Sequence, residues 1–503
     1  MKHIILYIIV LIALSSCKKF DYFQENPNRP TATDPSLLLT NIERVAFSTI
    51  SADAALASRQ LVYTQGNSTA QYYNWNRSSM GYSNIAQAVR MEQEAARVNK
   101  HNYRYLAKFF KSYFIVAMTQ TFGDIPYSKM MQSIENNNFS DSSATRPVYD
   151  KQRDIYIQVL KELKIASDSL GASSDAITGD VVYNGSINAW KKLINSFTLR
   201  VLMSLSKKEA DSELGIKQRF NEIVSNPTQY PLINTNSENG RLPYYDINGN
   251  RYPYYNNNSM KTDYYLDSSF VDILQNLNDP RLFTYGQPAG SVNTTTIKDF
   301  SKYDGLVGSA LLSYNTGKKG RSQASPINRR YAYEIVNEPS LLIGNSEVQF
   351  LLAEAVIRGW ITGNANDFYK NGIRASLQFS NFTYPAATGV AYNGQLYTTD
   401  EINNYLAQPI INLQAGKEIE QIITQKYISL FMNTGWQAFY EQRRTGYPVF
   451  ETVFSGVLNN KRIPKRWMYP LDEQNYNGIN LEAAIKSQYP NGDDINGVMW
   501  LIQ

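Results

Sequence analysis

Helical periodicity is the feature that most limits what this chain can fold into. Between residues 103 and 118, apolar side chains recur three and four positions apart, the spacing that gathers them on one face of a helix. Similar stripes occupy residues 155–170 and 190–205. The first stripe consists of Leu106, Phe109, Phe110, Tyr113, Phe114 and Ala117. We therefore expect a mainly α-helical protein in which each of these helices buries one face.

The later part of the chain predicts that helices pack in pairs. Ser346 and Gln349 have the spacing of a capping box, which marks the start of a helix. Gly363 and Asn364 break that helix, and a second one is expected over residues 367–379. The pair spans about 34 residues, the length of a tetratricopeptide hairpin. The predicted fold class is thus mainly α, built from tetratricopeptide-like helical hairpins.

Residues 227–339 interrupt this helical pattern. Asn, Gly, Tyr and Pro are frequent there, and helical periods are short or missing. Such a long irregular stretch in a compact protein is usually a functional elaboration rather than a linker. No break in composition divides the chain. We therefore expect residues 36–503 to form a single body with a large, irregular, loop-rich region that faces the ligand.

Residues 1–16 have the features of a signal peptide. A short basic start precedes an apolar run over residues 4–14, which is too short to cross a membrane core that requires about 20 residues. The run ends in small residues before Cys17, an arrangement that resembles a lipobox. We expect cleavage before Cys17, lipidation of its thiol, and an extended tether over residues 17–35, where Pro and Asn prevent a long helix.

Histidine and cysteine are scarce, which limits the chemistry open to the chain. Of its two histidines, His3 would leave with the signal peptide and His101 would remain, while Cys17 is the single cysteine. A histidine-dependent triad, a thiol nucleophile and a zinc site of several histidines or cysteines are therefore largely excluded. We expect no enzymatic activity, no cofactor and no metal site. Asp493 and Asp494 lack calcium-loop spacing and are interpreted as a surface turn.

A surface glycoside hydrolase is the main alternative function. Such an enzyme needs only two carboxylates, about 5 to 10 Å apart across a cleft. The chain has 44 acidic residues, and sequence spacing does not reveal whether two of them form such a pair. A purely structural lipoprotein is the third hypothesis. Nucleic acid is not expected as a partner, because the net charge is only +5 and the basic residues do not cluster.

The first candidate ligand site is the aromatic segment over residues 71–77. Tyr and Trp rings can stack on the faces of sugar rings, while amide and guanidinium groups supply hydrogen bonds. The alternative is that Trp75 packs on the scaffold. The candidate residues of this segment are Gln71, Tyr72, Tyr73, Trp75, Asn76 and Arg77.

The second candidate site is a stretch with seven tyrosines between residues 244 and 265. Tyr252, Tyr254 and Tyr255 are the candidate ligand contacts. Asparagines follow them directly, which argues against a buried strand. The alternative is that these tyrosines contact a protein partner. The basic pair at 443–444, in contrast, is expected to hold helices together rather than touch ligand.

Several short motifs follow one another in a characteristic order. They are the lipobox at Cys17, the turn at residues 122–127, and residues 278–282, 347–360, 441–448 and 462–470. Their order and spacing resemble the SusD/RagB family of nutrient-binding outer-membrane lipoproteins, in its second SusD-like branch. The resemblance covers nearly the whole mature chain. It implies tetratricopeptide-like helix pairs that support an irregular ligand-facing region, with ligand bound by loop aromatics and amides early in the chain.

The same resemblance implies a location and a partner. Proteins of this family sit on the outer membrane of Gram-negative bacteria as a lid over a SusC-like TonB-dependent barrel. They hand oligosaccharides, or in the RagB branch oligopeptides, to that barrel. This chain departs from the family at Lys18 and Lys19, because surface-exported relatives tend to be acidic directly after the cysteine. Apart from this departure, the resemblance leads us to expect a lipid-anchored, non-enzymatic binding protein displayed on the cell surface.

Overall fold

The computed structural model describes residues 33–290, 298–380 and 397–503. Helices predominate in these residues, and their strands form two two-stranded antiparallel sheets, β1 with β3 and β2 with β4. The prediction of a mainly α-helical fold is therefore confirmed. Cys17 and nearly all of the predicted tether lie outside the described residues.

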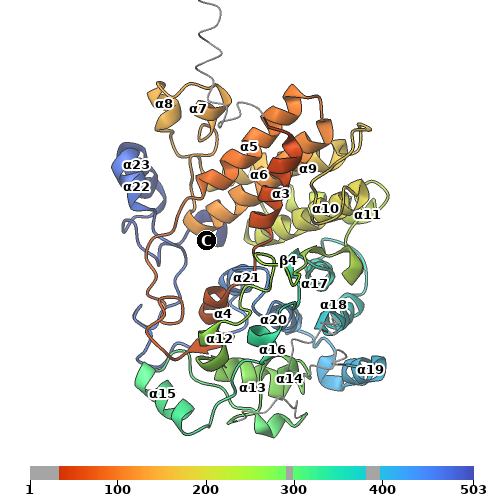
Figure 1. Ribbon diagram of the computed structural model, residues 1–503, viewed down its shortest axis with the longest axis vertical. Helices are drawn as coiled ribbons and strands as arrows, with labels where there is room; N and C mark the ends of the chain where they lie inside the picture. The colour runs from red at the N-terminus through yellow and green to blue at the C-terminus, as the bar shows by residue number, and fades with distance from the viewer. Residues whose placement is uncertain (1–32, 291–297, 381–396) are drawn as a thin grey trace, which may run out of the picture.

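The N-terminal helices form the upper half of the body in Figure 1. They are α3 (Pro35–Ala46), α5 (Tyr82–Arg97), α6 (His101–Phe122), α9 (Gln152–Ser169), α10 (Ile187–Ser204) and α11 (Ile216–Ser225). The three predicted apolar stripes lie in α6, α9 and α10. Because α3, α5 and α9 all pack against α6, its buried surface extends beyond the predicted stripe to Ile115 and Val116. Ala117, which was expected in the core, is exposed.

The predicted helical hairpin is present in the second half of the chain. It consists of α17 (Asn345–Ile357) and α18 (Ala365–Ser380), which are followed by α19 (Thr399–Ala407), α20 (Glu418–Ser429) and α21 (Gln437–Thr445). Gly372 lets α17 and α18 approach closely, since a Cβ atom there would lie 2.7 Å from the ring of Phe350. The pair thus packs as the periodicity predicts.

The predicted capping box that starts at Ser346 is wrong. Helix α17 begins one residue earlier, with Gly344 as its N-cap and no capping side chain of its own. The Ser346 hydroxyl donates to the carbonyl of Gly372 in α18 at 2.8 Å. The amide of Asn345 donates to the side chain of Asn239 at 2.7 Å. Contacts with distant residues therefore replace the local cap.

Buried charges join the helices of this half. The ion pairs Arg200–Glu347, Lys426–Glu441 and Arg444–Glu354 have N–O distances of 2.5 to 2.8 Å. They connect α10, α17, α20 and α21. Arg443 donates to the carbonyl oxygens of Gln120 at 2.8 Å and Lys465 at 2.9 Å. The prediction that residues 443 and 444 hold helices together is confirmed.

Residues 227–339 are irregular as predicted, yet they contain short elements. These are β2 (Gly240–Leu242), α12 (Asn258–Thr262), β3 (Tyr264–Leu266), α13 (Ser268–Asn276), α14 (Leu282–Tyr285), α15 (Leu312–Gly320) and α16 (Arg330–Tyr333), with β4 (Ser340–Ile343) directly after them. Elements α12 to α16 lie at the lower end of the molecule in Figure 1. Leu266 and Phe270 belong to the same hydrophobic cluster as Phe109 of α6. One core therefore runs through both halves.

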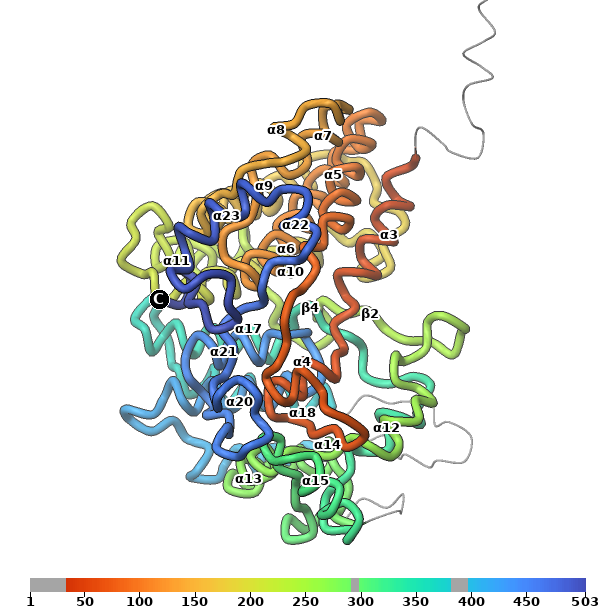
Figure 2. The backbone as a smooth tube through the Cα atoms, turned by 90° about the vertical axis from the view of Figure 1, so that its left-hand side faces the viewer, coloured from red at the N-terminus to blue at the C-terminus, as the bar shows by residue number. Residues whose placement is uncertain are grey.

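Early and late segments of the chain lie side by side. The early elements are α4 (Ala52–Ala57), β1 (Leu61–Tyr63), α7 (Gln132–Glu135) and α8 (Ser142–Thr145), and the late ones are α22 (Leu471–Tyr476) and α23 (Gly478–Gln488). Figure 2 shows the chain after α4 running beside the C-terminal segment. The backbones of Arg77 and Met468 form an isolated parallel β-bridge, and the amide of Leu458 donates to the carbonyl of Tyr72 at 2.9 Å.

The remaining described elements are short 3-10 helices. They lie at Ser206–Lys208, Asn236–Glu238, Phe300–Lys302, Pro409–Ile411 and Trp500–Ile502. Among the described helices, none combines the length and the hydropathy needed to cross a membrane.

Candidate ligand-binding surface

Trp75 is part of the scaffold. Its side chain is 6% exposed, and its ring stacks on Trp467 with centroids 4.7 Å apart and planes at 10°. Trp436 and Phe439 pack edge-on against the same ring. The indole N–H donates to the carbonyl of Arg466 at 3.0 Å. Since the side chain is buried, stacks on Trp467 and has its polar tip bonded, the expected stacking of Trp75 on a ligand is wrong and the alternative of scaffold packing is confirmed.

The neighbours of Trp75 are buried as well. Gln71, Tyr72 and Tyr73 are at most 2% exposed. The Gln71 side chain accepts a hydrogen bond from the amide of Tyr63 at 2.7 Å, which holds β1 in place. The Tyr73 hydroxyl donates to the carbonyl of Ala57 at 2.9 Å. The expectation that these three side chains face a ligand is therefore contradicted by their burial, and Gln71 and Tyr73 instead help to position β1 and α4.

The end of this segment is more accessible. Asn76 is exposed, and its role as a ligand contact stays a prediction. Arg77 lines a surface groove of about 540 Å³ beside α22, but its guanidinium donates to the carboxylate of Asp493 at 3.1 Å. Asp493 also pairs with Arg466 at 2.7 Å and is 10% exposed. Residues 493 and 494 lie in a partly exposed bend, which agrees with the interpretation as a surface turn, and the carboxylate of Asp493 joins two arginines there.

The tyrosine-rich stretch is divided between core and surface. Tyr252 is 2% exposed and packs edge-on against Tyr244, so its predicted ligand contact is contradicted. Burial raises the pKa of Tyr252 well above its usual value. Tyr254 and Tyr255 are half-buried and keep accessible ring surface. The hydroxyl of Tyr254 accepts a hydrogen bond from the amide of Ala52 at 2.8 Å, which joins this stretch to α4.

Tertiary structure brings the two candidate regions together at the antiparallel pair β1–β3. Tyr63 lies opposite Tyr264, and their ring centroids are 5.0 Å apart with planes at 39°. Both rings are half-buried. Residues opposite each other project to the same side of a sheet, so the two rings form one aromatic surface. We call β1 and β3, with Tyr63 and Tyr264, the tyrosine ribbon.

Polar groups surround one end of the tyrosine ribbon. The carboxylate of Asp263 accepts hydrogen bonds from the ammonium of Lys319 at 3.1 Å and the amide of Gln65 at 3.0 Å. Lys319 also contacts the hydroxyl of Thr64 at 3.1 Å. Burial alone would raise the pKa of Asp263, but hydrogen bonds from Gln65 and Lys319 lower it, so the carboxylate stays charged. Aromatic faces beside such donors and acceptors can bind polyhydroxyl ligands.

The sequence contained only a weak signal for this site. Tyr264 lies in the predicted tyrosine-rich stretch, but Tyr63 lies in neither candidate segment. Residues 61–63 have the apolar and aromatic side chains typical of a strand. A run of three residues is too short to predict a strand from its pattern, and its partner lies about 200 residues away. The pairing could therefore not be predicted.

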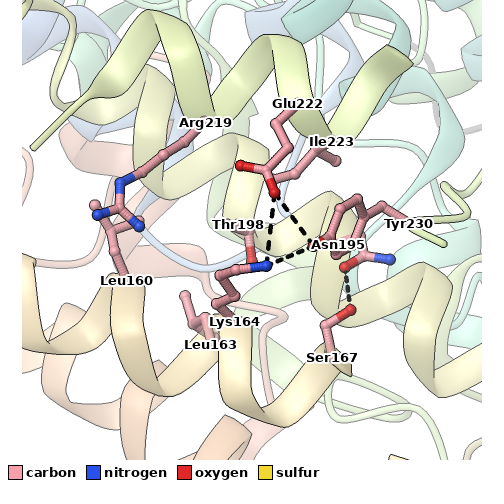
Figure 3. A pocket seen from close by; sticks show the side chains of 10 residues that line it. All are labelled: Leu160, Leu163, Lys164, Ser167, Asn195, Thr198, Arg219, Glu222, Ile223 and Tyr230. Atoms are coloured by element: carbon pink, nitrogen blue, oxygen red, sulfur yellow. Dashed lines mark hydrogen bonds and ion pairs between the residues drawn. The ribbon is translucent and has the colours of Figure 1, made fainter. Parts of the chain in front are cut away.

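A pocket between α9, α10 and α11 is too small to bind a sugar (Figure 3). Leu160, Leu163 and Ile223 line its apolar side. Lys164 crosses its mouth and donates to the hydroxyl of Tyr230 at 2.5 Å. Its volume of about 30 Å³ has room for roughly one water molecule. It is a packing defect between helices rather than a binding site.

Two pairs of carboxyl groups lie close to each other inside the protein. Glu43 and Asp180 form a close carboxyl pair, but Glu43 has no exposed surface and cannot reach a polymer. Glu354 and Glu441 are likewise buried between helices and paired with Arg444. Within the described residues, no group of three or more His, Cys, Asp or Glu side chains is placed to hold a metal ion.

Proteins of known structure have the same fold as this chain. Residues 27–470 match the second SusD-like family, described as starch-binding and associating with the outer membrane. An outer-membrane protein of Bacteroides vulgatus with a suggested role in nutrient binding is 35% identical, has a TM-score of 0.83, and aligns over 94% of this chain and 100% of its own. No functionally curated protein matches significantly.

Two further solved structures extend the comparison. A SusD homologue of Bacteroides fragilis is 38% identical with a TM-score of 0.81, over 94% of this chain and 99% of its own. A chitin-binding protein is 25% identical with a TM-score of 0.72, over 93% of this chain and 100% of its own. The chain belongs to the SusD-like family of nutrient-binding proteins associated with the outer membrane. The resemblance noted in its motifs is confirmed.

Proposed function

We propose that this protein binds nutrient oligosaccharides at the cell surface and delivers them, uncleaved, to a SusC-like TonB-dependent transporter. The tyrosine ribbon is the observation that carries the proposal. Two half-buried rings lie beside a carboxylate, an ammonium, an amide and a hydroxyl, which suit the CH faces and hydroxyl groups of sugars. The family description and the chitin-binding relative support a glycan over a peptide as the ligand.

We also propose that Cys17 carries the lipid that anchors the protein. The support is the lipobox-like sequence and the outer-membrane association of the family. The chain between Cys17 and the start of α3 at Pro35 can span at most about 60 Å. The binding surface would then stay close to the membrane and to a barrel partner within it.

Calorimetry with a starch oligomer, maltoheptaose, and a chitin oligomer, chitohexaose, tests the binding site. Tyr63→Ala and Tyr264→Ala should each weaken binding of the preferred oligomer by roughly 5- to 150-fold, by analogy with the about 1 to 3 kcal/mol lost when a base-stacking aromatic is removed. Tyr245→Ala is the matched control, because Tyr245 is 54% exposed in the same stretch but outside the ribbon.

Three results would contradict the proposal. If the wild-type protein has no affinity for either oligomer, the ligand is not the proposed class of oligosaccharide. If it prefers an oligopeptide, the ligand is a peptide. Release of shorter products during incubation would favour the glycoside hydrolase, provided that one Asp or Glu substitution abolishes it.

A further inference from the structure

A groove of about 490 Å³ lies between α13 and α20, apart from the tyrosine ribbon. Each helix contributes one face to it. The α13 wall consists of Ser269, Asp272, Ile273, Asn276 and Leu277, and the α20 wall of Lys417, Glu420, Gln421, Thr424 and Gln425. Both sets have the spacing of three and four residues that defines one side of a helix. Tyr369 lies in the lining as well, and Ile410, Gln414, Pro448 and Val449 complete it.

The composition of the two walls explains why they do not close on each other. Helices that pack directly interlock apolar side chains at distances of about 8 to 10 Å between axes. Here most wall side chains are polar, and closing the groove would remove water from the carboxylates of Asp272 and Glu420. The groove is therefore a built feature of the surface rather than a gap in the core.

Several polar side chains in this groove are not used by the fold. In the described parts of the chain, the side chains of Asp272, Asn276, Lys417 and Glu420 make no hydrogen bond or ion pair. Tyr369, from α18, is 1% exposed, and its hydroxyl has no hydrogen-bond partner among the described residues. Tyr369 lines the groove, so a ligand group that enters it can bond to this hydroxyl without displacing a hydrogen bond of the fold.

The chemistry of the groove defines the ligand that it suits. Its free groups include two carboxylates, one ammonium, an amide and a phenol, which together accept and donate hydrogen bonds. Ile273 and Leu277 add an apolar strip along one wall. With two negative groups and one positive group, the groove repels polyanions. Its volume lies within the range of about 300 to 1,000 Å³ found for small-ligand sites.

We propose that the groove between α13 and α20 is a second oligosaccharide-binding site, which takes a short neutral stretch of a glycan. The ligand class rests on the proposed function, whereas the site itself does not involve the ribbon. Helix α13 begins two residues after β3, so a rigid element joins the two sites. A polymer long enough to reach both would bind with an effective concentration advantage over a short oligomer.

The test uses calorimetry on the Tyr63→Ala, Tyr264→Ala double variant, in which binding at the ribbon is removed. Maltoheptaose and chitohexaose are the probes, and one of them should still bind. Adding Tyr369→Phe should weaken this residual binding roughly 2- to 10-fold, because one hydrogen bond is lost while the ring is kept. The melting temperature should not fall, since the hydroxyl has no partner in the fold.

A second variant, Glu420→Ala, has a matched control on the same turn of α20. Glu420→Ala should weaken the residual binding roughly 10-fold or more, as expected for a hydrogen bond to a charged group. The control is Glu418→Ala. Glu418 does not line the groove, so this variant should leave the residual binding unchanged.

The outcomes separate this site from the ribbon. Wild-type binding that disappears completely in the double variant would overturn the second site and leave the proposed function intact. Residual binding that is insensitive to both Tyr369→Phe and Glu420→Ala would place it elsewhere and also overturn the inference. Wild-type protein that binds neither probe would overturn both proposals. Binding of an oligopeptide, but of neither sugar, would show that the ligand is a peptide and not a glycan.

Discussion

At the scale of single residues, burial decides which aromatic side chains can meet a ligand. Trp75 and Tyr73 come from a segment rich in residues that bind sugars, yet both are buried, and the rings that pack on Trp75 follow much later in the chain. Tyr63 and Tyr264 are only partly buried, although each packs against the other and against the core. Composition alone does not distinguish these two situations.

Trp75→Ala should lower stability without changing ligand affinity. Truncating a buried Trp typically costs about 3 to 5 kcal/mol, because a large cavity forms and packing contacts are lost. Urea denaturation of the variant should show a loss of this size, while calorimetry with the preferred oligosaccharide should give wild-type affinity. Asn74→Ala is the control at the exposed neighbouring position. Normal stability combined with weakened binding would show that Trp75 contacts the ligand and is not part of the scaffold.

The carboxyl group of Glu43 should make stability depend on pH. Its side chain in α3 accepts a hydrogen bond from the amide of Val181 at 2.7 Å. Burial first, and the nearby Asp180 carboxylate second, raise the pKa of Glu43 from 4.5 to about 10. Between these values the folded protein holds a proton that the unfolded chain releases. The free energy of unfolding should therefore fall as pH rises, by at most about 1.4 kcal/mol per pH unit.

Glu43→Gln isolates this contribution, because glutamine has a similar shape and cannot ionise. Urea denaturation at several pH values between about 6 and about 9 should show wild-type stability declining relative to the variant. Glu482→Gln, at an exposed position in α23, should follow the wild-type profile. Parallel profiles for wild type and Glu43→Gln would show that Glu43 is already ionised in the folded state.

At the scale of elements, the α17–α18 hairpin depends on close approach at Gly372. A Cβ atom there would lie 2.7 Å from the Phe350 ring, so Gly372→Ala should force the helices apart and destabilise the protein by about 1 to 3 kcal/mol. In Gly320→Ala, at the end of α15, the new methyl group meets no atom within 4 Å, and stability should stay the same or rise slightly. Equal stability of the two variants in urea would contradict this packing.

At the scale of the whole molecule, the proposed lipid anchor determines where the protein works. Cys17→Ala should move the protein from the membrane fraction to the soluble fraction, because the residues that the structure describes, from Thr33 onward, contain no helix that could span a membrane in place of the lipid. Fractionation followed by immunoblotting measures this directly. Ser16→Ala keeps the cysteine and a small residue before it, so that variant should stay with the membrane. Continued membrane partitioning of Cys17→Ala would rule out the cysteine as the anchor.

Features that depend on neighbours along the chain could be predicted from the order of the residues. The helices α6, α9, α10 and the α17–α18 hairpin were predicted because side chains three and four residues apart share a helix face, wherever the helix packs. The motif order that indicates the SusD-like family is also read along the chain, and the family match confirmed it. The capping box at Ser346 was wrong because a distant residue, Asn239, supplies the cap.

The surfaces that are available to a ligand depend instead on contacts between segments far apart in the chain. Trp75 is covered by Trp467 and Trp436, Tyr63 is aligned with Tyr264, and the walls of the groove between α13 and α20 come from segments about 150 residues apart. None of these contacts has a periodic signal in the sequence. The physical reason is that burial is set by the sum of contacts from all elements that surround a side chain, whereas local periodicity records only which face of its own element it occupies.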